Sequence, residues 1–571
     1  MKIRIILCTA LVLLLGPPMQ AEAAGAQSGT ATVLSANATL DQISSLAQAG
    51  NAEAQFQFAK RYDNGQGVAQ DYRQALFWYL KSADQGNFKA QNNLGVLYDA
   101  GKGVTQDKKQ AVFWYRKSAE QGNPLAQNNL GLMYRDGTGI AQDYTQAVFW
   151  LRKAAEQGFA NAQNSLGVMY ITGKGVPQDD KQAVFWYRKA AEQGNAAAQQ
   201  NLGGMYRIGK GVAQDYAQAV SWYRKAAAQG FPDAQTDLGV MYITGHGVTQ
   251  DYAQALYWYR KAAEQGNTTA QNNLGLMYRD ETGVARDYAQ AISWFRKAAD
   301  QGFAAAQDNL GGMYQAGFGV TQDYAQALSW YRKAADQGFT DAQTHIGIMY
   351  IIGQGVAQDY AQALSWYHKA ADQGNIAAQN NLGGMYRDGQ GVTQDYVQAV
   401  FWYRKAADQG FALAQNSLGV MYNTGKGVAQ DHVQAASWYR KAAEQGNASA
   451  QNNLGSMYNL GIGVAQDYAQ ALFWYRKSAD QDDADAQDSL GTLYYEGKGV
   501  ARDYAQAAYW YRKAVAQNNP AAQHDLGVLY ENGQGVPQDK QQAIELYRKA
   551  AAQTDDPEAR QMAQERLSQL Q

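Results

Sequence analysis

The chain has little cysteine, little histidine and no excess of charge of either sign. It has 571 residues with one cysteine, Cys8, five histidines, and 49 basic against 51 acidic residues, for a net charge of -2. A lone cysteine forms no disulfide within the chain, so stability must come from packing. Balanced charge gives no long-range attraction to nucleic acid, which calls for a clustered basic face. We therefore predict no nucleic-acid partner.

Long apolar runs are also missing beyond the first residues. No 18-residue apolar stretch follows the N-terminus, so we predict no membrane span in the mature chain. Lys2 and Arg4 precede a mostly apolar segment, residues 5–15, and a small-x-small site that ends at Ala23. This order is typical of a secretory signal peptide over residues 1–23, cleaved at Ala23; an uncleaved anchor is the alternative. The prediction is a periplasmic or secreted protein with a flexible segment at residues 24–37.

Signatures of catalysis are absent as well. The histidines fall at different places in the repeat described below and form no H-E-x-x-H motif. No cysteine remains after cleavage, and neither G-x-S-x-G nor G-x-x-x-x-G-K-[ST] occurs. The G-x-G turns, such as Gly101-x-Gly103, end predicted helices and so do not resemble a dinucleotide-binding loop. We predict no enzyme, no catalytic residues, no cofactor and no metal.

What the chain does contain is one 36-residue unit in fourteen copies, without insertion or deletion. A fixed period between about 20 and 50 residues predicts a solenoid, in which each unit buries its apolar face on its neighbours. The predicted divisions are an N-terminal capping helix at 38–53, repeats at 54–557 and a C-terminal capping helix at 558–571. The copies begin at Ala54, Ala90, Ala126, Ala162, Ala198, Ala234, Ala270, Ala306, Ala342, Ala378, Ala414, Ala450, Ala486 and Ala522.

Each copy predicts two helices joined by a glycine-containing turn. In the second copy, Leu94 and Leu97 fall on one face of a helix that ends at Gly101. Asp107 then stands where the next helix starts, and Gln110 follows three residues later. Aspartate and glutamine at this spacing predict a capping box. A metal ligand or catalytic acid is the weaker interpretation of the same aspartate.

Two further positions predict how the helices pack. Glycine recurs inside the first helix, as at Gly95, and indicates that another helix approaches closely there because interior glycine costs about 1 kcal/mol. Tryptophan occupies one place in thirteen copies, and a ring repeated in strict register is typical of core packing. These residues are Trp78, Trp114, Trp150, Trp186, Trp222, Trp258, Trp294, Trp330, Trp366, Trp402, Trp438, Trp474 and Trp510.

The full pattern, A-x-x-x-L-G-x-M-Y-x-x-G-x-G-V-x-x-D-x-x-x-A-x-x-W-Y-x-K-A-A-x-x-G, resembles the Sel-1-like repeat (SLR). That family is related to the tetratricopeptide repeat. The resemblance implies an all-α fold: an α-solenoid, wound as a right-handed superhelix, of 14 tandem 36-residue helix-turn-helix repeats with N- and C-terminal capping helices. It also implies an adaptor, because members act mostly in bacterial envelope, signalling and host-contact processes.

Positions that vary between copies are the candidates for binding a partner. In the first helix these are the third, fourth, seventh, tenth and eleventh residues of the unit, which share one strip of the helix. We call this the variable strip, and the resemblance implies that it lines a concave surface. Amide side chains at the third position offer hydrogen-bond donors and acceptors. At the tenth position arginine alternates with isoleucine between copies. The candidates are Asn92, Asn128, Arg135, Ile171, Arg207, Ile243, Asn272, Arg279, Ile351, Asn380 and Arg387.

The sequence thus predicts a non-catalytic scaffold or adaptor that binds a protein or peptide along the concave face. A strip that is only solvated polar surface is the plain alternative. A binder of peptidoglycan or another cell-wall glycan is a second one. Cysteine-rich secreted SLR proteins have been credited with β-lactamase-like activity, but this chain lacks their disulfide cysteines, which makes an enzyme of that kind the least favoured.

Overall fold

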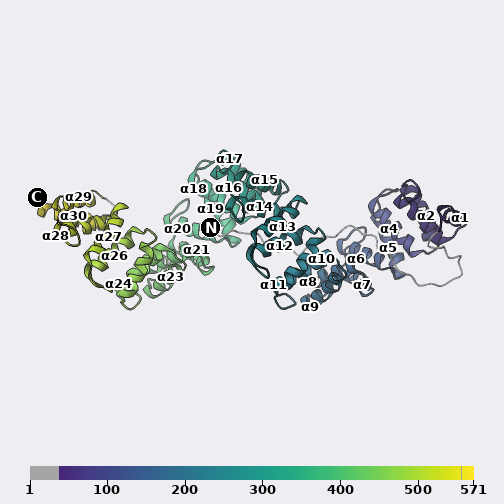
Figure 1. The fold of residues 1–571 in the computed structure, drawn as a ribbon, viewed down its shortest axis with the longest axis horizontal. Coiled ribbons are helices and arrows are strands. Elements are labelled where there is room, and N and C mark those ends of the chain that lie inside the picture. The colour runs from purple at the N-terminus through teal and green to yellow at the C-terminus, as the bar shows by residue number, and fades with distance from the viewer. Residues whose placement is uncertain (1–37, 554–555, 571) are drawn as a thin grey trace. The chain divides into compact units, whose positions relative to one another are not determined.

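The computed structural model describes residues 38–553 and 556–570. The predicted cleavage at Ala23 and the segment 24–37 lie outside these residues. The described residues form thirty helices and no strand. They divide into two compact units, unit 1 ending at Phe303 and unit 2 beginning at Ala304 (Figure 1).

Helices of thirteen residues dominate both units. Unit 1 contains α1 Leu40–Gln48, α2 Ala52–Asn64, α3 Tyr72–Asp84, α4 Phe88–Ala100, α5 Lys108–Glu120, α6 Pro124–Asp136, α7 Tyr144–Glu156, α8 Ala160–Thr172, α9 Asp180–Glu192, α10 Ala196–Ile208, α11 Tyr216–Ala228, α12 Pro232–Thr244, α13 Tyr252–Glu264, α14 Thr268–Asp280 and α15 Tyr288–Asp300. Unit 2 contains α16 Ala304–Ala316, α17 Tyr324–Asp336, α18 Thr340–Ile352, α19 Tyr360–Asp372, α20 Ile376–Asp388, α21 Tyr396–Asp408, α22 Ala412–Thr424, α23 His432–Glu444, α24 Ala448–Leu460, α25 Tyr468–Ala479, α26 Ala484–Glu496, α27 Tyr504–Ala516, α28 Pro520–Asn532, α29 Lys540–Ala552 and α30 Pro557–Leu570.

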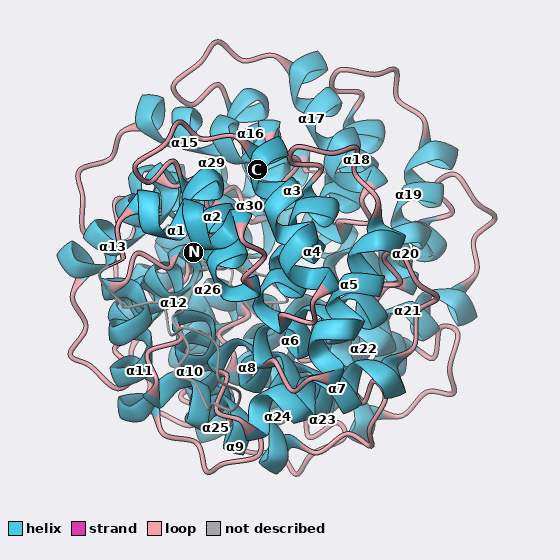
Figure 2. Ribbon diagram, turned by 90° about the vertical axis from the view of Figure 1, so that its right-hand side faces the viewer, coloured by secondary structure: helices cyan, strands magenta, loops and turns pink. Residues whose placement is uncertain are grey.

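The even-numbered helices α2 to α28 are the first helices of the fourteen repeats, and α3 to α29 are the second helices. Within each unit every helix packs against the one before and the one after it. Figure 2 shows the second helices α11 and α13 farther out than the first helices α10 and α12. The terminal helices α1 and α30 flank the array, so the predicted all-α solenoid with terminal helices is confirmed. The first repeat begins at Ala52, two residues ahead of the predicted boundary.

A buried tyrosine of the second helix packs against the interior glycine of the first. In the copy that begins at Ala198, a Cβ built on Gly203 would lie 2.6 Å from the ring of Tyr223, which is completely buried. No side chain larger than hydrogen fits there without moving the ring. The predicted close approach at the interior glycine is therefore confirmed, and the approaching group is an aromatic side chain.

The aspartate that starts each second helix is its N-cap in all fourteen copies. Asp107 accepts hydrogen bonds from the backbone N–H groups of Lys109 at 2.9 Å and Gln110 at 3.0 Å. Its own N–H donates to the carbonyl oxygen of Tyr98 in the first helix, at 3.0 Å. In a capping box the Gln110 side chain would use that N–H. The prediction that Asp107 caps the helix is thus confirmed. The predicted return bond from the Gln110 side chain to the Asp107 N–H is wrong, because that N–H already donates to Tyr98 of the first helix.

Two glutamines join three successive helices in the repeats before the last one, where the Gln523 Oε1 has no hydrogen-bond partner. The Gln91 Nε2 donates to the carbonyl oxygen of Ala83, at the end of α3, at 3.1 Å. The Nε2 of Gln121, which caps the end of α5, donates in turn to the Gln91 Oε1 at 2.7 Å. The same pair of bonds recurs along both units, for example at Gln199 and Gln379. This glutamine relay satisfies buried amide groups and fixes each first helix between two second helices.

The tryptophans divide into two classes. Seven are at most 9% exposed, and each follows an aromatic residue whose ring packs edge-on against the indole: Trp78, Trp114, Trp150, Trp186, Trp402, Trp474 and Trp510. The other six are half-buried: Trp222, Trp258, Trp294, Trp330, Trp366 and Trp438. Five of these six follow serine, and a lysine ammonium lies 3.7–4.1 Å from the indole ring centre instead. The prediction of core packing holds for the first class and only in part for the second.

Adjacent glycines allow a matched test of the glycine–tyrosine contact. Replacing Gly203 with alanine should destabilise the chain by roughly 1–3 kcal/mol, because the new Cβ overlaps the Tyr223 ring. Replacing Gly204 should stabilise it by up to about 1 kcal/mol, because alanine favours helix and its Cβ would lie 3.8 Å from the Tyr223 hydroxyl. Urea unfolding of both variants checks this, and equal midpoints would show that the contact does not constrain the fold.

Candidate functional site

All eleven candidate residues of the variable strip lie on first helices, but they differ in accessibility. Five are buried, with at most 8% of their surface exposed: Asn92, Asn128, Ile171, Ile243 and Asn272. Five are half-buried, namely Arg135, Arg207, Arg279, Ile351 and Asn380, and Arg387 is exposed. These five residues, all of which lie in unit 1, are therefore inaccessible to a partner in the folded chain.

The burial arises because neighbouring first helices approach closely enough for their strip residues to bond. The Asn129 Nδ2 donates to Asn92 Oδ1 at 3.3 Å, and the Asn201 Nδ2 donates to Asn164 Oδ1 at 3.0 Å. Each such bond, which we call a rung, joins the third position of one copy to the fourth position of the next. In unit 2 a rung joins Asn453 to Asn416. Amides of neighbouring copies therefore bond one another at these rungs, although others, such as the Oδ1 atoms of Asn128 and Asn380, are buried without a hydrogen-bond partner.

Three of the four arginines are held by the aspartate that follows them. Arg135 donates to both carboxylate oxygens of Asp136, at 2.7 and 2.9 Å. Arg279 bonds Asp280 in the same way, as Arg387 does Asp388. The bond from Arg387 lowers the pKa of the Asp388 carboxyl. An acidic partner would have to compete with these pairs, which weakens the strip as a cationic surface.

One rung in unit 1 carries a carboxyl group. Asp237 is 2% exposed and accepts a hydrogen bond from Gln200, while its Oδ1 has no hydrogen-bond partner. Burial raises the pKa of Asp237 to about 7, an effect that the Gln200 hydrogen bond and the charge of Arg207 oppose. Asp237 is therefore an ionisable group buried inside the strip, with a proton to lose near neutral pH.

Sequence reasoning missed the glutamine relay and the buried Asp237. The relay had a clear signal, since Gln91 and Gln121 have an identical glutamine at their places in all fourteen copies. Gln91 is also buried, and a glutamine that recurs at a buried place in every copy is expected to make a structural hydrogen bond. Asp237 had no comparable signal, because aspartate on a variable position is typical of solvent-exposed surface.

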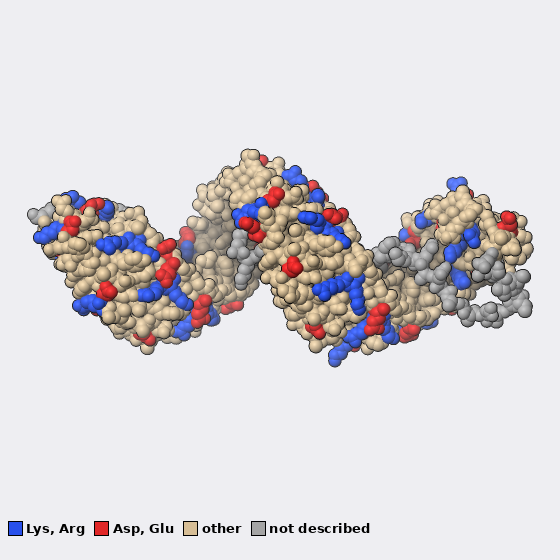
Figure 3. Space-filling model, viewed as in Figure 1, with Lys and Arg blue, Asp and Glu red and all other residues tan. Residues whose placement is uncertain are grey.

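The described residues show no concentrated charge and no preformed metal centre. Figure 3 shows basic and acidic residues interspersed on the face in view. No group of three or more His, Cys, Asp or Glu among residues 38–553 and 556–570 is arranged to hold a metal ion. No helix in the same part of the chain is long and apolar enough to cross a membrane.

The arrangement of helices, caps and glycines is that of a known repeat. The Sel1 repeat family matches fourteen consecutive segments that together run from residue 52 to residue 555: 52–87, 88–123, 124–159, 160–195, 196–231, 232–267, 268–303, 304–339, 340–375, 376–411, 412–447, 448–483, 484–519 and 520–555. The chain belongs to the Sel1 repeat family. Proteins built from Sel1 repeats typically serve as scaffolds for protein interaction.

Solved Sel1 repeat proteins resemble the chain. One is a protective antigen present in uropathogenic Escherichia coli strains, described as having an SLR fold. It is 39% identical, the match covers 80% of this chain and 97% of that one, and the TM-score is 0.59. Another is a Sel1 repeat protein from Oxalobacter formigenes, 37% identical over 55% of this chain and 91% of that one, with a TM-score of 0.43. A search of curated proteins found no match.

The buried carboxyl group predicts a pH dependence of stability. In the unfolded chain Asp237 ionises near its ordinary pKa of 3.8, whereas in the folded chain it keeps its proton to about pH 7. Stability should therefore fall as pH rises from 4 to 7, by about 1.4 kcal/mol for each unit of pKa difference. The D237N variant should lose this slope and exceed the wild type in melting temperature at pH 8.

Thermal unfolding between pH 4 and pH 8 measures the effect. The exposed Asp84, on α3, supplies the control D84N, which should follow the wild-type profile. A D237N profile that also follows the wild type would show that Asp237 ionises normally in the folded chain.

Proposed function

We propose that the chain is a non-catalytic scaffold that binds a protein or peptide through the accessible part of its variable strip. The observation that carries the proposal is the difference between the units. In unit 1 the strip residues Ile171 and Ile243 are buried, whereas in unit 2 their equivalent Ile351 is half-buried. The neighbouring Ile352, at the eleventh position, is 56% exposed.

The chemistry around Ile352 suits a partner segment with an apolar anchor. Ile351 and Ile352 end α18, and Arg387 and Asp388 end α20, the next first helix. Asn380, half-buried near the start of α20, adds a side-chain amide. A combination of apolar side chains with charged and amide groups is the usual composition of an interaction site with a buried centre and a polar rim. We name Ile351, Ile352, Asn380, Arg387 and Asp388 the α18–α20 surface.

The proposal includes a setting, in the periplasm or outside the cell and in bacterial envelope or host-contact processes. The N-terminal pattern that ends at Ala23 supports export. The related protein from uropathogenic Escherichia coli, described as a protective antigen, supports the host-contact alternative.

Charge reversal on the α18–α20 surface tests the proposal. The R387E variant should reduce recovery of the principal partner by about tenfold or more, since it removes a charged group that the partner would contact. The measurement is affinity purification from the native envelope fraction with quantitative mass spectrometry, followed by a Kd for the purified partner and the full chain.

The control is K540E, which makes the same charge change at an exposed site on the second helix α29. K540E should bind the partner as the wild type does. Equal loss in both variants, or no loss in R387E, would contradict the assignment of the α18–α20 surface. Sedimentation of the chain with purified cell wall, without a protein partner, would favour the glycan alternative instead.

A further inference from the structure

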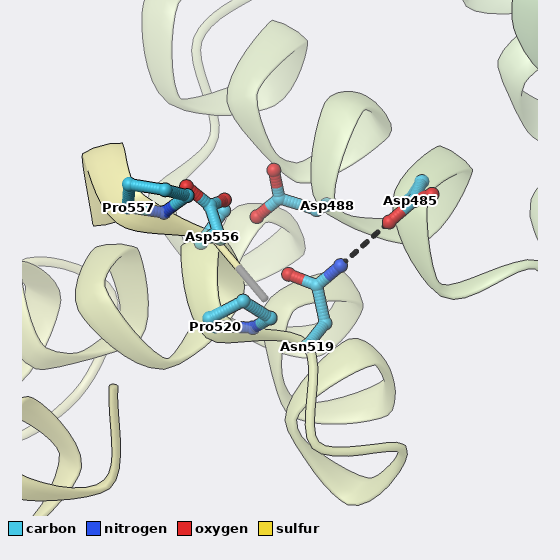
Figure 4. A pocket seen from close by; sticks show the side chains of 7 residues that line it. Asp485, Asp488, Asn519, Pro520, Asp556 and Pro557 are labelled. Carbon is cyan, nitrogen blue, oxygen red and sulfur yellow. Dashed lines mark hydrogen bonds between the residues drawn. The ribbon is translucent and has the colours of Figure 1, made fainter. Parts of the chain in front are cut away.

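A cavity of about 350 Å³ lies in unit 2, between the last two repeats and the C-terminal helix. Asp485 and Asp488 come from α26, Asn519 and Pro520 from the start of α28, and Asp556 directly precedes α30. Figure 4 shows the Asp488 carboxylate pointing toward Asp556 while Asp485 bonds Asn519. Three carboxyl groups, two from α26 and one from the cap of α30, therefore border one space.

Two of the three carboxyl groups have hydrogen-bond donors, but none has a cation. Asp485 accepts from the Asn519 Nδ2 at 2.8 Å, and Asp556 accepts from the Ala559 N–H at 2.9 Å as the N-cap of α30. The Oδ1 of Asp488 is buried and has no hydrogen-bond partner. No ion pair joins any of the three to a basic side chain in the part of the chain that the structure describes. The cavity thus gathers three carboxyl groups that have no cationic partner among the described residues.

Comparison with other copies shows that Asp488 is exceptional. It occupies the third position of its unit, where the rung to the next copy begins. The same position in an earlier copy holds Asp308, whose carboxylate bonds the Nδ1 of His345 at 2.8 Å. Opposite Asp488 the next copy places Asp525, a second acid. Other rungs join two amides, as at Asn453 and Asn416, or a histidine and a carboxylate, as at His345 and Asp308, whereas here the rung brings together two acids.

Burial raises the pKa of Asp488 well above its ordinary value, and the charges of Asp525, Asp485 and Asp556 raise it further. Burial likewise raises the pKa of Asp485. A buried carboxylate without a partner is costly, and a bound cation relieves that cost.

We propose that this cavity binds an organic cation, an alkylammonium or guanidinium group, through Asp488, Asp556 and Asp485. Such groups carry several N–H donors and can bridge carboxylates that are not arranged to chelate a metal ion. The cavity size lies at the lower end of the range for small-ligand sites, about 300–1,000 Å³. The group can belong to a free amine or to a lysine or arginine side chain of a peptide. The site is separate from the α18–α20 surface and does not depend on it.

Isothermal titration calorimetry on the full chain, at a low ionic strength of about 20 mM where screening is weak, tests the proposal. The probes are putrescine, N-acetyl-lysine amide and N-acetyl-arginine amide, with N-acetyl-glycine amide as the neutral control. We expect saturable binding at one site for at least one cation and none for the neutral probe. Preference for putrescine indicates a free amine as the natural ligand, and preference for an amide indicates a peptide side chain.

Two variants remove charge without removing volume or the helix cap. D488N and D556N should each weaken binding by at least about tenfold, as expected when one partner of a buried charge pair is lost. Asparagine at 556 still accepts from the Ala559 N–H, so α30 keeps its cap. D308N, at the same unit position as Asp488 but in the pair with His345, should bind as the wild type does.

Proton release gives a readout that a merely structural role would not produce. A bound cation favours the ionised form of Asp488, whose pKa is raised in the free site, so binding should release protons and its heat should depend on the buffer. The titratable groups that face Asp488 are Asp485 on its own helix, Asp525 with its partner His524 on α28, and Asp556 before α30. Two buried tyrosines, Tyr475 on α25 and Tyr511 on α27, face it as well, and the pKa of each is raised by burial. Binding that D488N leaves unchanged, or no saturable binding by any cationic probe, would overturn the proposal.

Discussion

The contact between an interior glycine and a buried tyrosine ring is the constraint on which the repeat depends. At Gly203 and Tyr223 it brings the first and second helices of a copy closer than any larger residue would permit. Where the tyrosine is replaced, Leu151 and Phe295 keep an apolar group over the glycine. The glutamine relay then holds the next second helix at a fixed place. One steric contact and one amide pair, repeated with the period of the sequence, therefore account for the regular stacking within each unit.

Close stacking of the copies buries polar side chains at the third and fourth positions of the unit. Neighbouring first helices approach until their third and fourth residues bond across the gap, so polar side chains that vary between copies become buried. Buried polar groups are costly unless they find partners. Amide rungs such as Asn201 with Asn164 meet that requirement. Asp237 and Asp488 meet it poorly, and their carboxyl groups hold protons more tightly as a result.

Local features of the fold could be predicted from the sequence, whereas accessibility could not. Helix limits, the Asp107 cap and the close approach at the interior glycines depend on residues within one copy, and the period displays them fourteen times. Accessibility depends on how copies stack. Ile171 and Ile351 occupy the same unit position, yet the first is 8% exposed and the second is half-buried. Trp186 follows phenylalanine and Trp222 follows serine, a local difference that sequence reasoning could have used, but Trp258 follows Tyr257 and is half-buried all the same.

The rungs also bear on how so repetitive a chain assembles correctly. Because the glycine–tyrosine contact and the glutamine relay are nearly the same in every copy, a first helix could dock beside a second helix from the wrong repeat at little cost. Tandem arrays are prone to this kind of misassembly. The rung residues do differ: His345 fits opposite Asp308, and Asn201 fits opposite Asn164. A wrong neighbour would leave such a group buried without its hydrogen-bond partner. The strip residues that differ between copies therefore make the correct order of helices more stable than a shifted one.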